Sequence, residues 1–378
     1  MRVRGRGVEI IGMIATQEAS EILPAQGPLI DPEFTARFAQ VHEAGGFDRI
    51  LIGYGTYWAD GWQVANHVAR ATSRIGLLLA HRPGFVAPSL TARQAVSFDH
   101  LAGGGRLALH IITGGDEADQ RRDGDFLHHD SRYRRTGEYL RILRGLFESA
   151  EPLDFEGEFY HLEGASLPAR PATEVGIPLY FGGASAAAVD VGARYADVYM
   201  LWGEPLASAQ ARIEEARAAA ARYNRTLRFS VSVRPIIAPT EAAAWARAEE
   251  IASLAAAQRS RFLGARGRRD STSVGSARLL AAAAEAPVHD ERLFTKIAAI
   301  TGAAGNSTAL VGTPEQVAEA LLRYVDIGCD TLLIRGFLPY QDALEYGREL
   351  VPLLRQKSEL SRAEGERPAG GSAAPPRD

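Results

Sequence analysis

IGLLLAHRPGFVAPSLTARQAVSFDHLAGGGRLALHIITGGDE, residues 75–117, contains one complete strand–helix–strand unit. An apolar run at residues 75–80 precedes a Pro/Gly loop, a segment with apolar residues at helical spacing, three glycines and a second apolar run at residues 107–112. Crossovers of this kind connect strands of a parallel sheet, whose carboxyl ends are where ligands bind. Polar residues follow both runs: His81, Arg82, Thr113 and Asp116. The unit therefore predicts an enzyme.

Outward from this unit, strand and helix patterns alternate through most of the chain. Strands are predicted at residues 8–15, 49–53, 75–80, 107–112, 178–181, 197–201, 227–237 and 331–335, each followed by a helical pattern. Eight alternating units favour a TIM (β/α)8 barrel over an open sheet. Such a barrel needs about 250 residues, so we assign residues 1–357 to a barrel with insertions. The insertions are residues 151–178, with a hairpin around 155–162, and residues 258–312, a long irregular segment typical of a lid.

The composition predicts the character of the C-terminal tail, the kinds of partner that are excluded and the cellular compartment of the protein. Residues 358–378 are rich in Pro, Gly and Ala and predict a disordered tail. The formal net charge of -4 and the lack of a basic stripe argue against nucleic acid or an anionic membrane as partner. The single cysteine, Cys329, excludes an internal disulfide and a cysteine-rich metal site. No apolar run approaches the ~20 residues that span a bilayer, so we expect a cytoplasmic protein.

A glycine pair in residues 179–185, LYFGGAS, lies between a predicted strand and a helix that starts near Ser185. Glycines such as Gly183 let the backbone approach a phosphate, and helix N-terminal amides with a serine hydroxyl hold one. The alternative is an ordinary strand–turn–helix junction with a serine cap. His129 and Tyr133 stand four residues apart at the start of another predicted helix, hence on one face. The histidines there are consecutive and have no second cluster, so no metal site is expected.

Charged and aromatic side chains gather near the predicted strand ends. The charged or titratable ones are His81, Arg82, His110, Arg234 and Arg335. An arginine at such a place binds an anion or forms a structural ion pair. The aromatic ones are Trp58, Trp62, Trp202 and Phe337, which suit either a core or a flat ring such as isoalloxazine. Neither G-x-S-x-G, GxGxxG nor GxxxxGK[ST] occurs, so a nucleophilic serine and the common nucleotide sites have no support.

Seven blocks of sequence, in order, carry a family resemblance. They are ADGW (59–62), TARQAVSFDHLAGGGRLALHIITGGDE (91–117), GDFLHHDSRY (124–133), LYFGGAS (179–185), DVYMLWGEP (197–205), TALVGTPEQVAE (308–319) and RGFLPYQDALEYG (335–347). Together they resemble the bacterial luciferase-like flavin monooxygenases, and most of all the alkanesulfonate monooxygenase branch. The resemblance spans residues 10–354. Its motifs are specific for the family and not for one substrate.

The resemblance implies a TIM barrel that takes reduced FMN (FMNH2) from a separate NAD(P)H-dependent flavin reductase and reacts it with dioxygen. A flavin peroxide would then oxygenate a small organic substrate, in this branch an organosulfur compound such as an alkanesulfonate. Family flavin contacts carry over to Asp60, Thr113, His129, Tyr133 and Ser185, and the loop with Gly183 would hold the FMN phosphate. The family also implies a mobile lid at residues 258–312 and a homo-oligomer, dimer or tetramer. Some members have a cis peptide bond, which here would fall near Ala80 and His81.

Several positions depart from the alkanesulfonate branch. Trp58 replaces a cysteine, Arg234 a histidine and Phe337 a tyrosine, and the lid arginine has no counterpart ahead of Gly305. We expect Arg234 to anchor the substrate or stabilise developing negative charge, and His81 to donate or accept a proton. The residues expected to contact substrate are Trp58, Arg82, Trp202 and Phe337. Two alternatives remain: F420-dependent hydride transfer on the same barrel, and a flavin- or ligand-binding barrel without catalysis.

Overall fold

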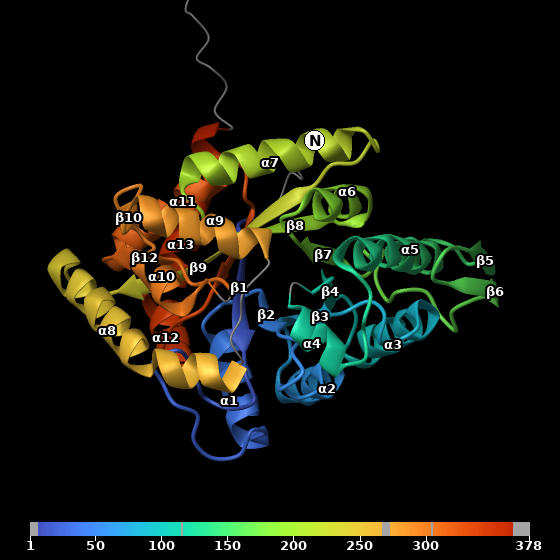
Figure 1. Cartoon of the computed structure of the whole chain (residues 1–378), viewed down its shortest axis with the longest axis horizontal. Coiled ribbons are helices and arrows are strands. Elements are labelled where there is room, and N and C mark those ends of the chain that lie inside the picture. Colours follow the sequence, from blue (N-terminus) through green and yellow to red (C-terminus); the bar gives the residue numbers. More distant parts are fainter. Residues whose placement is uncertain (1–6, 115, 267–272, 304, 366–378) are drawn as a thin grey trace, which may run out of the picture.

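Eight parallel strands close into a barrel in the computed structural model, which describes residues 7–114, 116–266, 273–303 and 305–365 (Figure 1). Their order is β1-β2-β3-β4-β7-β8-β9-β13, and β13 pairs back onto β1. The strands are β1 (Glu9–Ile14), β2 (Arg49–Ile52), β3 (Gly76–His81), β4 (Leu107–Ile112), β7 (Leu179–Gly182), β8 (Val198–Trp202), β9 (Arg228–Ile237) and β13 (Thr331–Ile334). All eight predicted strands and the predicted TIM barrel are confirmed.

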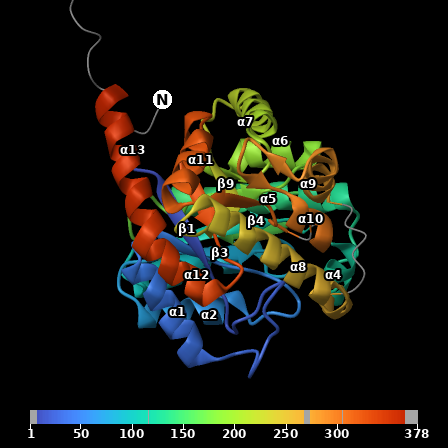
Figure 2. The same ribbon diagram turned by 90° about the vertical axis from the view of Figure 1, so that its left-hand side faces the viewer.

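Helices surround this barrel (Figure 2). They are α1 (Pro32–Ala44), α2 (Gly61–Ala71), α3 (Pro88–Leu101), α5 (His129–Glu148), α6 (Ala186–Tyr195), α7 (Leu206–Ala221), α11 (Pro314–Asp326), α12 (Pro339–Glu345), the π-helical turn η1 (Tyr346–Leu350) and α13 (Val351–Gly365). Side chains fix where they begin, as expected from the sequence. Asp31 accepts a hydrogen bond from the Phe34 amide at 2.9 Å, and Thr313 forms a capping box with Gln316.

The barrel strands are buried on both faces, as parallel strands between a lumen and a helix layer must be. All six residues of β3 are buried. Leu77 and Leu79 pack into the core shared with the helices, whereas Leu78 packs inside the barrel with Ile11 and Ala108. Because side chains alternate along a strand, every second residue faces the lumen.

The two predicted insertions contain regular structure. The first forms the expected hairpin of β5 (Leu153–Glu156) and β6 (His161–Ala165). The second, expected to be irregular, is instead mostly ordered into helix and strand. It holds the end of α8 (Glu241–Arg266), then α9 (Val274–Glu285), β10 (Val288–His289), β11 (Leu293–Phe294), α10 (Lys296–Thr301) and β12 (Ala309–Gly312). Its strands have only two to four residues, too few for a recognisable period. Residues 267–272 lie outside the described residues, and the lid stays a prediction.

Strand β9 joins this insertion to the barrel. Its first part, from Ser230 to Val233, pairs with β13, and its last part, from Arg234 to Ile237, pairs with β12. A ten-residue strand thus serves two ladders in succession. The strands β12, β11 and β10 extend the sheet outside the closed barrel.

Three smaller features complete the fold. The short helix α4 (Glu117–Arg122) follows β4 and was not predicted. Helix α13 runs to Gly365, so the predicted disordered tail begins as helix, and residues 366–378 lie outside the described residues. Every described peptide bond is trans, including that between Ala80 and His81, so the expectation of a cis bond there is wrong.

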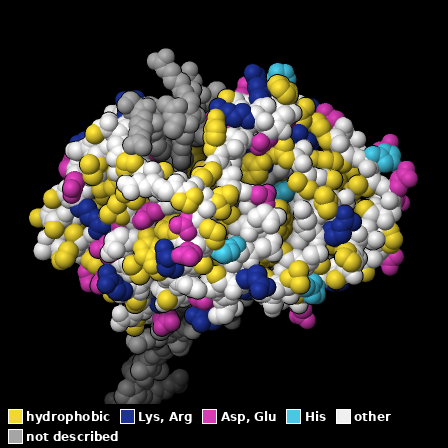
Figure 3. Space-filling model, turned by 90° about the horizontal axis from the view of Figure 1, so that it is seen from below, with side chains coloured by type: hydrophobic (Ala, Val, Ile, Leu, Met, Phe, Trp, Pro, Cys, Tyr) yellow, Lys and Arg dark blue, Asp and Glu magenta, His cyan; other side chains and the backbone are white. Residues whose placement is uncertain are grey.

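The surface carries mixed charge. On the face seen in Figure 3, acidic and basic side chains are interspersed with hydrophobic ones, and neither sign forms a continuous patch among the coloured residues. In the part of the chain that the structure describes, no helix is long and apolar enough to cross a membrane.

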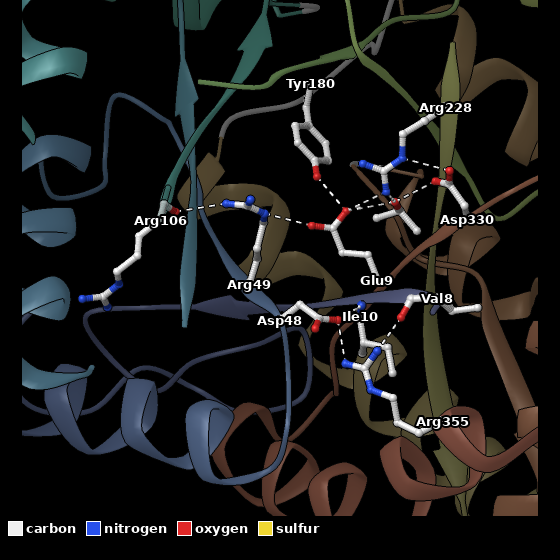
Figure 4. A network of polar contacts seen from close by, with 11 residues as sticks. Val8, Glu9, Ile10, Asp48, Arg49, Arg106, Tyr180, Arg228, Asp330 and Arg355 are labelled. Carbon is white, nitrogen blue, oxygen red and sulfur yellow. Dashed lines mark hydrogen bonds and ion pairs between the residues drawn. The ribbon is translucent and has the colours of Figure 1, made fainter. Parts of the chain in front are cut away.

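A charged network closes the amino-terminal end of the barrel, which we call the floor (Figure 4). Glu9 is its centre: Oε1 accepts from Arg49 Nε at 2.9 Å, and Oε2 accepts from the Tyr180 hydroxyl at 2.7 Å and from Arg228 Nη2 at 3.2 Å. Burial alone would raise the pKa of Glu9, but the two arginines and the Tyr180 hydrogen bond together hold that pKa below its usual value. Arg228 also donates to Asp330 at 2.9 Å. The floor is a paired network with its charges matched.

Candidate active site

The carboxyl ends of the strands form the opposite end of the barrel, which we call the mouth. Lumen-facing side chains there include Met13, His110, Ser232 and Arg335, as the alternation along their strands requires. Contacts among them agree with this placement. Arg335 Nη1 lies 3.6 Å from Met13 Sδ, and Nη2 donates to the Asn306 carbonyl at 3.1 Å. Asn306 in turn donates to the Ser232 hydroxyl at 2.9 Å.

One side of the mouth, at the end of β7, forms a cradle of four predicted residues, Gly183, Ser185, Tyr133 and His129. Ser185 caps α6 by accepting from the Ala188 amide at 3.2 Å, and its side chain is close enough to Tyr133 to lower the pKa of that hydroxyl, against the larger effect of burial. The rings of His129 and Tyr133 lie 4.9 Å apart. Burial raises the pKa of Tyr133, so its hydroxyl keeps its proton.

Only glycine fits at position 183. A Cβ there would lie 2.5 Å from the Ala188 Cβ and 3.2 Å from the Tyr133 hydroxyl oxygen. The Gly183 carbonyl accepts from the Tyr199 hydroxyl at 2.8 Å, which fixes the turn. The bare backbone therefore leads directly to the amides that begin α6, a geometry that suits a phosphate group.

An arginine that the sequence did not single out lies beside this cradle. Arg278, on α9, donates through Nε to Glu204 at 2.9 Å, and its Nη1 lies 3.5 Å from the Ala184 carbonyl. It brings positive charge to the turn between Gly183 and Ser185. Sequence spacing alone could not place it there, because α9 belongs to the insertion expected to be irregular.

Across the mouth from β7, a cavity of about 190 Å³ opens at the ends of β13, β1 and β2. In the strand order, β7 stands opposite β1, so the cradle and the cavity lie on opposite sides of the barrel. The cavity is lined by apolar residues and by the charged residues Glu21, Arg234 and Arg335. Its other polar lining residues are Thr16, Gln17, Ser20 and His42. Trp58, one of the predicted substrate contacts, also lines it and is 43% exposed.

Arg234 is the most enclosed charged residue of the cavity, at 1% exposed. Its Nη1 donates to Glu21 Oε2 at 2.8 Å and its Nη2 to the Gly336 carbonyl at 2.8 Å. The guanidinium stacks 3.5 Å from the ring centre of Phe337, which is fully buried. Burial alone would raise the pKa of Glu21, but Arg234 and Arg335 lower it to about 2, so the carboxylate is ionised.

Two predicted residues lie away from the lumen. His81 points into the helix layer, where its Nε2 is hydrogen-bonded to the Tyr139 hydroxyl at 2.7 Å. Burial lowers the pKa of His81 to about 4, so the ring is neutral near pH 7. Thr113 contacts the Thr136 hydroxyl of α5 at 3.2 Å. The expected proton transfer by His81 gains no support from this position.

The remaining predicted residues are spread around the rim of the mouth. Asp60 caps α2 by accepting from the Gln63 amide at 3.1 Å. Arg82 is buried and pairs with Asp119 at 2.7 Å. Trp202 packs against the insertion, since a Cβ on Gly275 would lie 3.0 Å from its ring.

Several buried polar atoms near the mouth have no hydrogen-bond partner among the described residues. They are Arg82 Nε and Nη1, His110 Nδ1, Gln120 Oε1 and Arg234 Nε. Burial lowers the pKa of His110 to about 4, which leaves a neutral ring facing the lumen. Buried polar groups without partners are rare and costly in folded proteins. Such atoms at the mouth are compatible with a polar ligand, although others occur elsewhere among the described residues. No group of three metal-binding side chains occurs among the described residues.

The closed ring of eight parallel strands, with the cradle and the cavity on opposite sides of its mouth, defines the chain as a TIM barrel. The family model of the luciferase-like monooxygenases matches residues 9–331, so the chain belongs to that family. It is accordingly an enzyme of the flavin-dependent monooxygenase class.

Solved structures share the fold over nearly the whole chain. EDTA monooxygenase (EmoA) from Chelativorans sp. BNC1 is 21% identical with a TM-score of 0.74, covering 93% of this chain and 94% of that one. Riboflavin lyase (RcaE), solved with modified FMN and riboflavin, is 19% identical with a TM-score of 0.75, covering 93% and 92%. An F420-dependent secondary alcohol dehydrogenase is 15% identical with a TM-score of 0.68, covering 93% and 100%. At these identities the similarity concerns the fold.

Proposed function

We propose that this enzyme binds reduced FMN, delivered by a separate NAD(P)H-dependent flavin reductase, and uses dioxygen to oxygenate a small organic substrate. The observation that carries the proposal is the placement of a phosphate cradle and an apolar cavity on opposite sides of one barrel mouth. A ligand held by its phosphate at β7 would extend its ring across the lumen toward the cavity. Its reacting edge and the substrate would then meet.

The cofactor would be held mainly by the cradle. Ser185, Tyr133 and the α6 amides would bind the phosphate, with Arg278 supplying charge from the insertion. His110 would face the ring with its unpartnered Nδ1. When bound, the reduced flavin supplies the electrons that activate dioxygen, and the protein supplies binding, orientation and protection from water.

The cavity side would position the substrate and keep water away. Its apolar walls disfavour water, and Trp58 would cover its outer edge. The predicted lid at residues 258–312 would complete this enclosure. An organosulfur substrate remains compatible with the cavity, since sulfur compounds include uncharged as well as anionic ones. We also propose a homo-oligomer, dimer or tetramer, from family membership.

The experiment that tests this function is an anaerobic titration of the protein with photoreduced FMN and, separately, with reduced F420. Tight binding of FMNH2, followed by consumption of dioxygen on mixing with aerated buffer, would support the proposal. Transfer of isotopically labelled dioxygen into an organic product would identify the enzyme as an oxygenase. Binding of F420 alone would contradict the proposal and indicate hydride transfer instead. Flavin binding with no product in a broad substrate screen would favour a barrel that only binds.

A further inference from the structure

The cavity at β13, β1 and β2 has two parts. Met13 and Ile14 are neighbours on β1 whose side chains point to opposite sides of the strand, and both line the cavity. The cavity therefore wraps around the end of β1, from the mouth into the layer between strands and helices. Six lining residues belong to the core that the strands share with the helices, and we call the part that they line the arm. They are Ile14, Phe38, Ile52, Val64, Ala343 and Tyr346.

The arm is an apolar space inside a core. The charged lining residues Glu21, Arg234 and Arg335 belong to the part at the mouth, and the Tyr346 hydroxyl donates to the Pro235 carbonyl. Protein interiors are close-packed, and an empty space among apolar side chains lowers stability because the lining loses packing contacts. The arm therefore suits the apolar part of a ligand, which would restore those contacts.

One polar side chain, that of His42 on α1, lines the cavity beside Phe38. The rings of Phe38 and Phe47 pack against it, with their centres 4.7 and 4.8 Å from its own. Its Nδ1 lies 2.8 Å from the Phe38 carbonyl oxygen, and because a carbonyl only accepts, Nδ1 carries the proton. Burial lowers the pKa of His42 to about 4, so the ring is neutral near pH 7 and Nε2 keeps a lone pair.

This lone pair of Nε2 is available to a ligand. The ring edge lies against β1 where Gly12 has no side chain, since a Cβ there would be 2.5 Å from Nε2. Nε2 makes no hydrogen bond among the described residues and, unlike His110 Nδ1, is not fully enclosed by protein atoms. His42 is only 2% exposed, so this opening faces the cavity that the residue lines. A buried acceptor is costly to leave unsatisfied, so it favours a ligand that donates to it.

We propose that the arm holds the apolar portion of the substrate, and that an uncharged O–H or N–H group on this portion donates a hydrogen bond to His42 Nε2. An aliphatic alcohol is the simplest molecule with this chemistry. His42 is then a specificity-determining residue, because it favours a substrate with a donor over one of the same size without a donor. The inference rests on the proposed function, since it names the substrate class of the same site.

The test compares two isomers, 1-heptanol and hexyl methyl ether. They contain the same atoms, but only the alcohol has a hydrogen-bond donor. Titration calorimetry of the full-length wild-type protein should show the alcohol binding about fivefold more tightly, the effect of one neutral hydrogen bond. Equal affinities, tighter binding of the ether, or no binding of the alcohol would each overturn the inference. Flavin binding is followed separately by fluorescence, so its failure would contradict the proposed function and leave the comparison of the isomers standing.

A substitution of His42 assigns the preference to this residue. His42→Phe keeps a ring of similar size beside Phe38 and Phe47 and removes the acceptor, so the alcohol and the ether should bind this variant equally. His67→Phe, which replaces an exposed histidine of α2 outside the cavity lining, should leave the fivefold preference unchanged. A folded His42→Phe protein that still prefers the alcohol would overturn the inference.

A second substitution tests the arm itself. Ala343→Leu places a larger side chain in the arm and should weaken the binding of both isomers at least about tenfold. Ala69→Leu makes the same change on α2, outside the cavity lining, and should alter neither affinity. If Ala343→Leu left both affinities unchanged, the isomers would bind elsewhere and the inference would be overturned. The wild-type comparison decides the matter if neither variant folds.

Discussion

The two ends of the barrel differ in how their buried polar groups are hydrogen-bonded. At the floor, Glu9 is bonded by Arg49, Tyr180 and Arg228, and the charges compensate one another. At the mouth, acceptors and donors such as Gln120 Oε1 and His110 Nδ1 are buried without partners among the described residues. One set of strands carries both ends. The difference is the one expected if hydrogen bonding at the floor serves stability and the proposed site at the mouth serves a ligand.

Removing the centre of the floor should have the largest effect on stability. Glu9→Gln leaves Arg49 and Arg228 without their shared countercharge, and breaking a buried ion network costs about 3 kcal/mol of unfolding free energy. Urea unfolding measures this loss. Glu241→Gln, which breaks a half-exposed pair with Arg292, should change the same quantity far less, because solvent screens exposed pairs. Equal losses in the two variants would mean that the floor network contributes no more to stability than an exposed ion pair does.

The mouth should respond to the loss of Arg278 in cofactor affinity, in addition to the stability lost when its pair with the buried Glu204 is broken. A charged hydrogen bond to phosphate contributes about 1.5–3 kcal/mol, so Arg278→Gln should weaken FMNH2 binding by about 10- to 100-fold. Reduced riboflavin, which lacks the phosphate, should bind the variant and the wild type equally. Arg212→Gln, in an ion pair on α7, serves as the charge-matched control. A parallel loss of riboflavin affinity would show that Arg278 only supports the fold.

Acid should lower the free energy of unfolding through the buried histidine His81 before it protonates Glu9 at the floor. Burial lowers the pKa of His81 from 6.5 to about 4, so between these values the unfolded chain binds a proton that the folded chain does not. Stability therefore falls as the pH falls, and this histidine contributes about 2 kcal/mol of loss between pH 7 and pH 5. Urea unfolding at both pH values measures it. The lowered pKa of Glu9 keeps the floor ionised over this range.

His81→Gln is the matched variant for that measurement. It keeps a hydrogen-bonding side chain beside Tyr139 but has no titratable ring, so its stability should depend less on pH. An unchanged pH dependence would assign the effect to other buried histidines, of which His42 and His110 also have a pKa lowered to about 4.

The smallest expected effect is that of Ser185→Ala. Loss of the N-cap of α6 should lower the free energy of unfolding by about 1 kcal/mol. Loss of its phosphate contact should weaken FMNH2 binding about fivefold, the effect of one neutral hydrogen bond. Ser273→Ala removes a similar cap from α9 and should reproduce only the first change. If both variants lost FMNH2 affinity alike, Ser185 would have no direct part in binding.

The sequence could predict the barrel because its strands are apolar runs at regular intervals, each followed by a helix with recognisable caps. It could also predict the cradle, since Gly183, Ser185 and Tyr133 lie in motifs that fold locally. The pair of Arg234 with Glu21 joins residues 213 apart, and no local pattern reveals it. The side of the barrel wall on which His81 lies could not be predicted, because a place at a strand end does not specify the face. Its neighbour Ala80 has the lumen-facing position.

The insertion touches both halves of the proposed site. Through Arg278 it reaches the Ala184 carbonyl, and through β12 it pairs with the backbone of Arg234, whose amide donates to the Thr308 carbonyl at 3.0 Å. A change in the length or packing of the insertion would therefore alter both the cradle and the cavity. Cofactor choice and substrate choice would then be inherited together in this segment, as a single exchangeable module on a constant barrel.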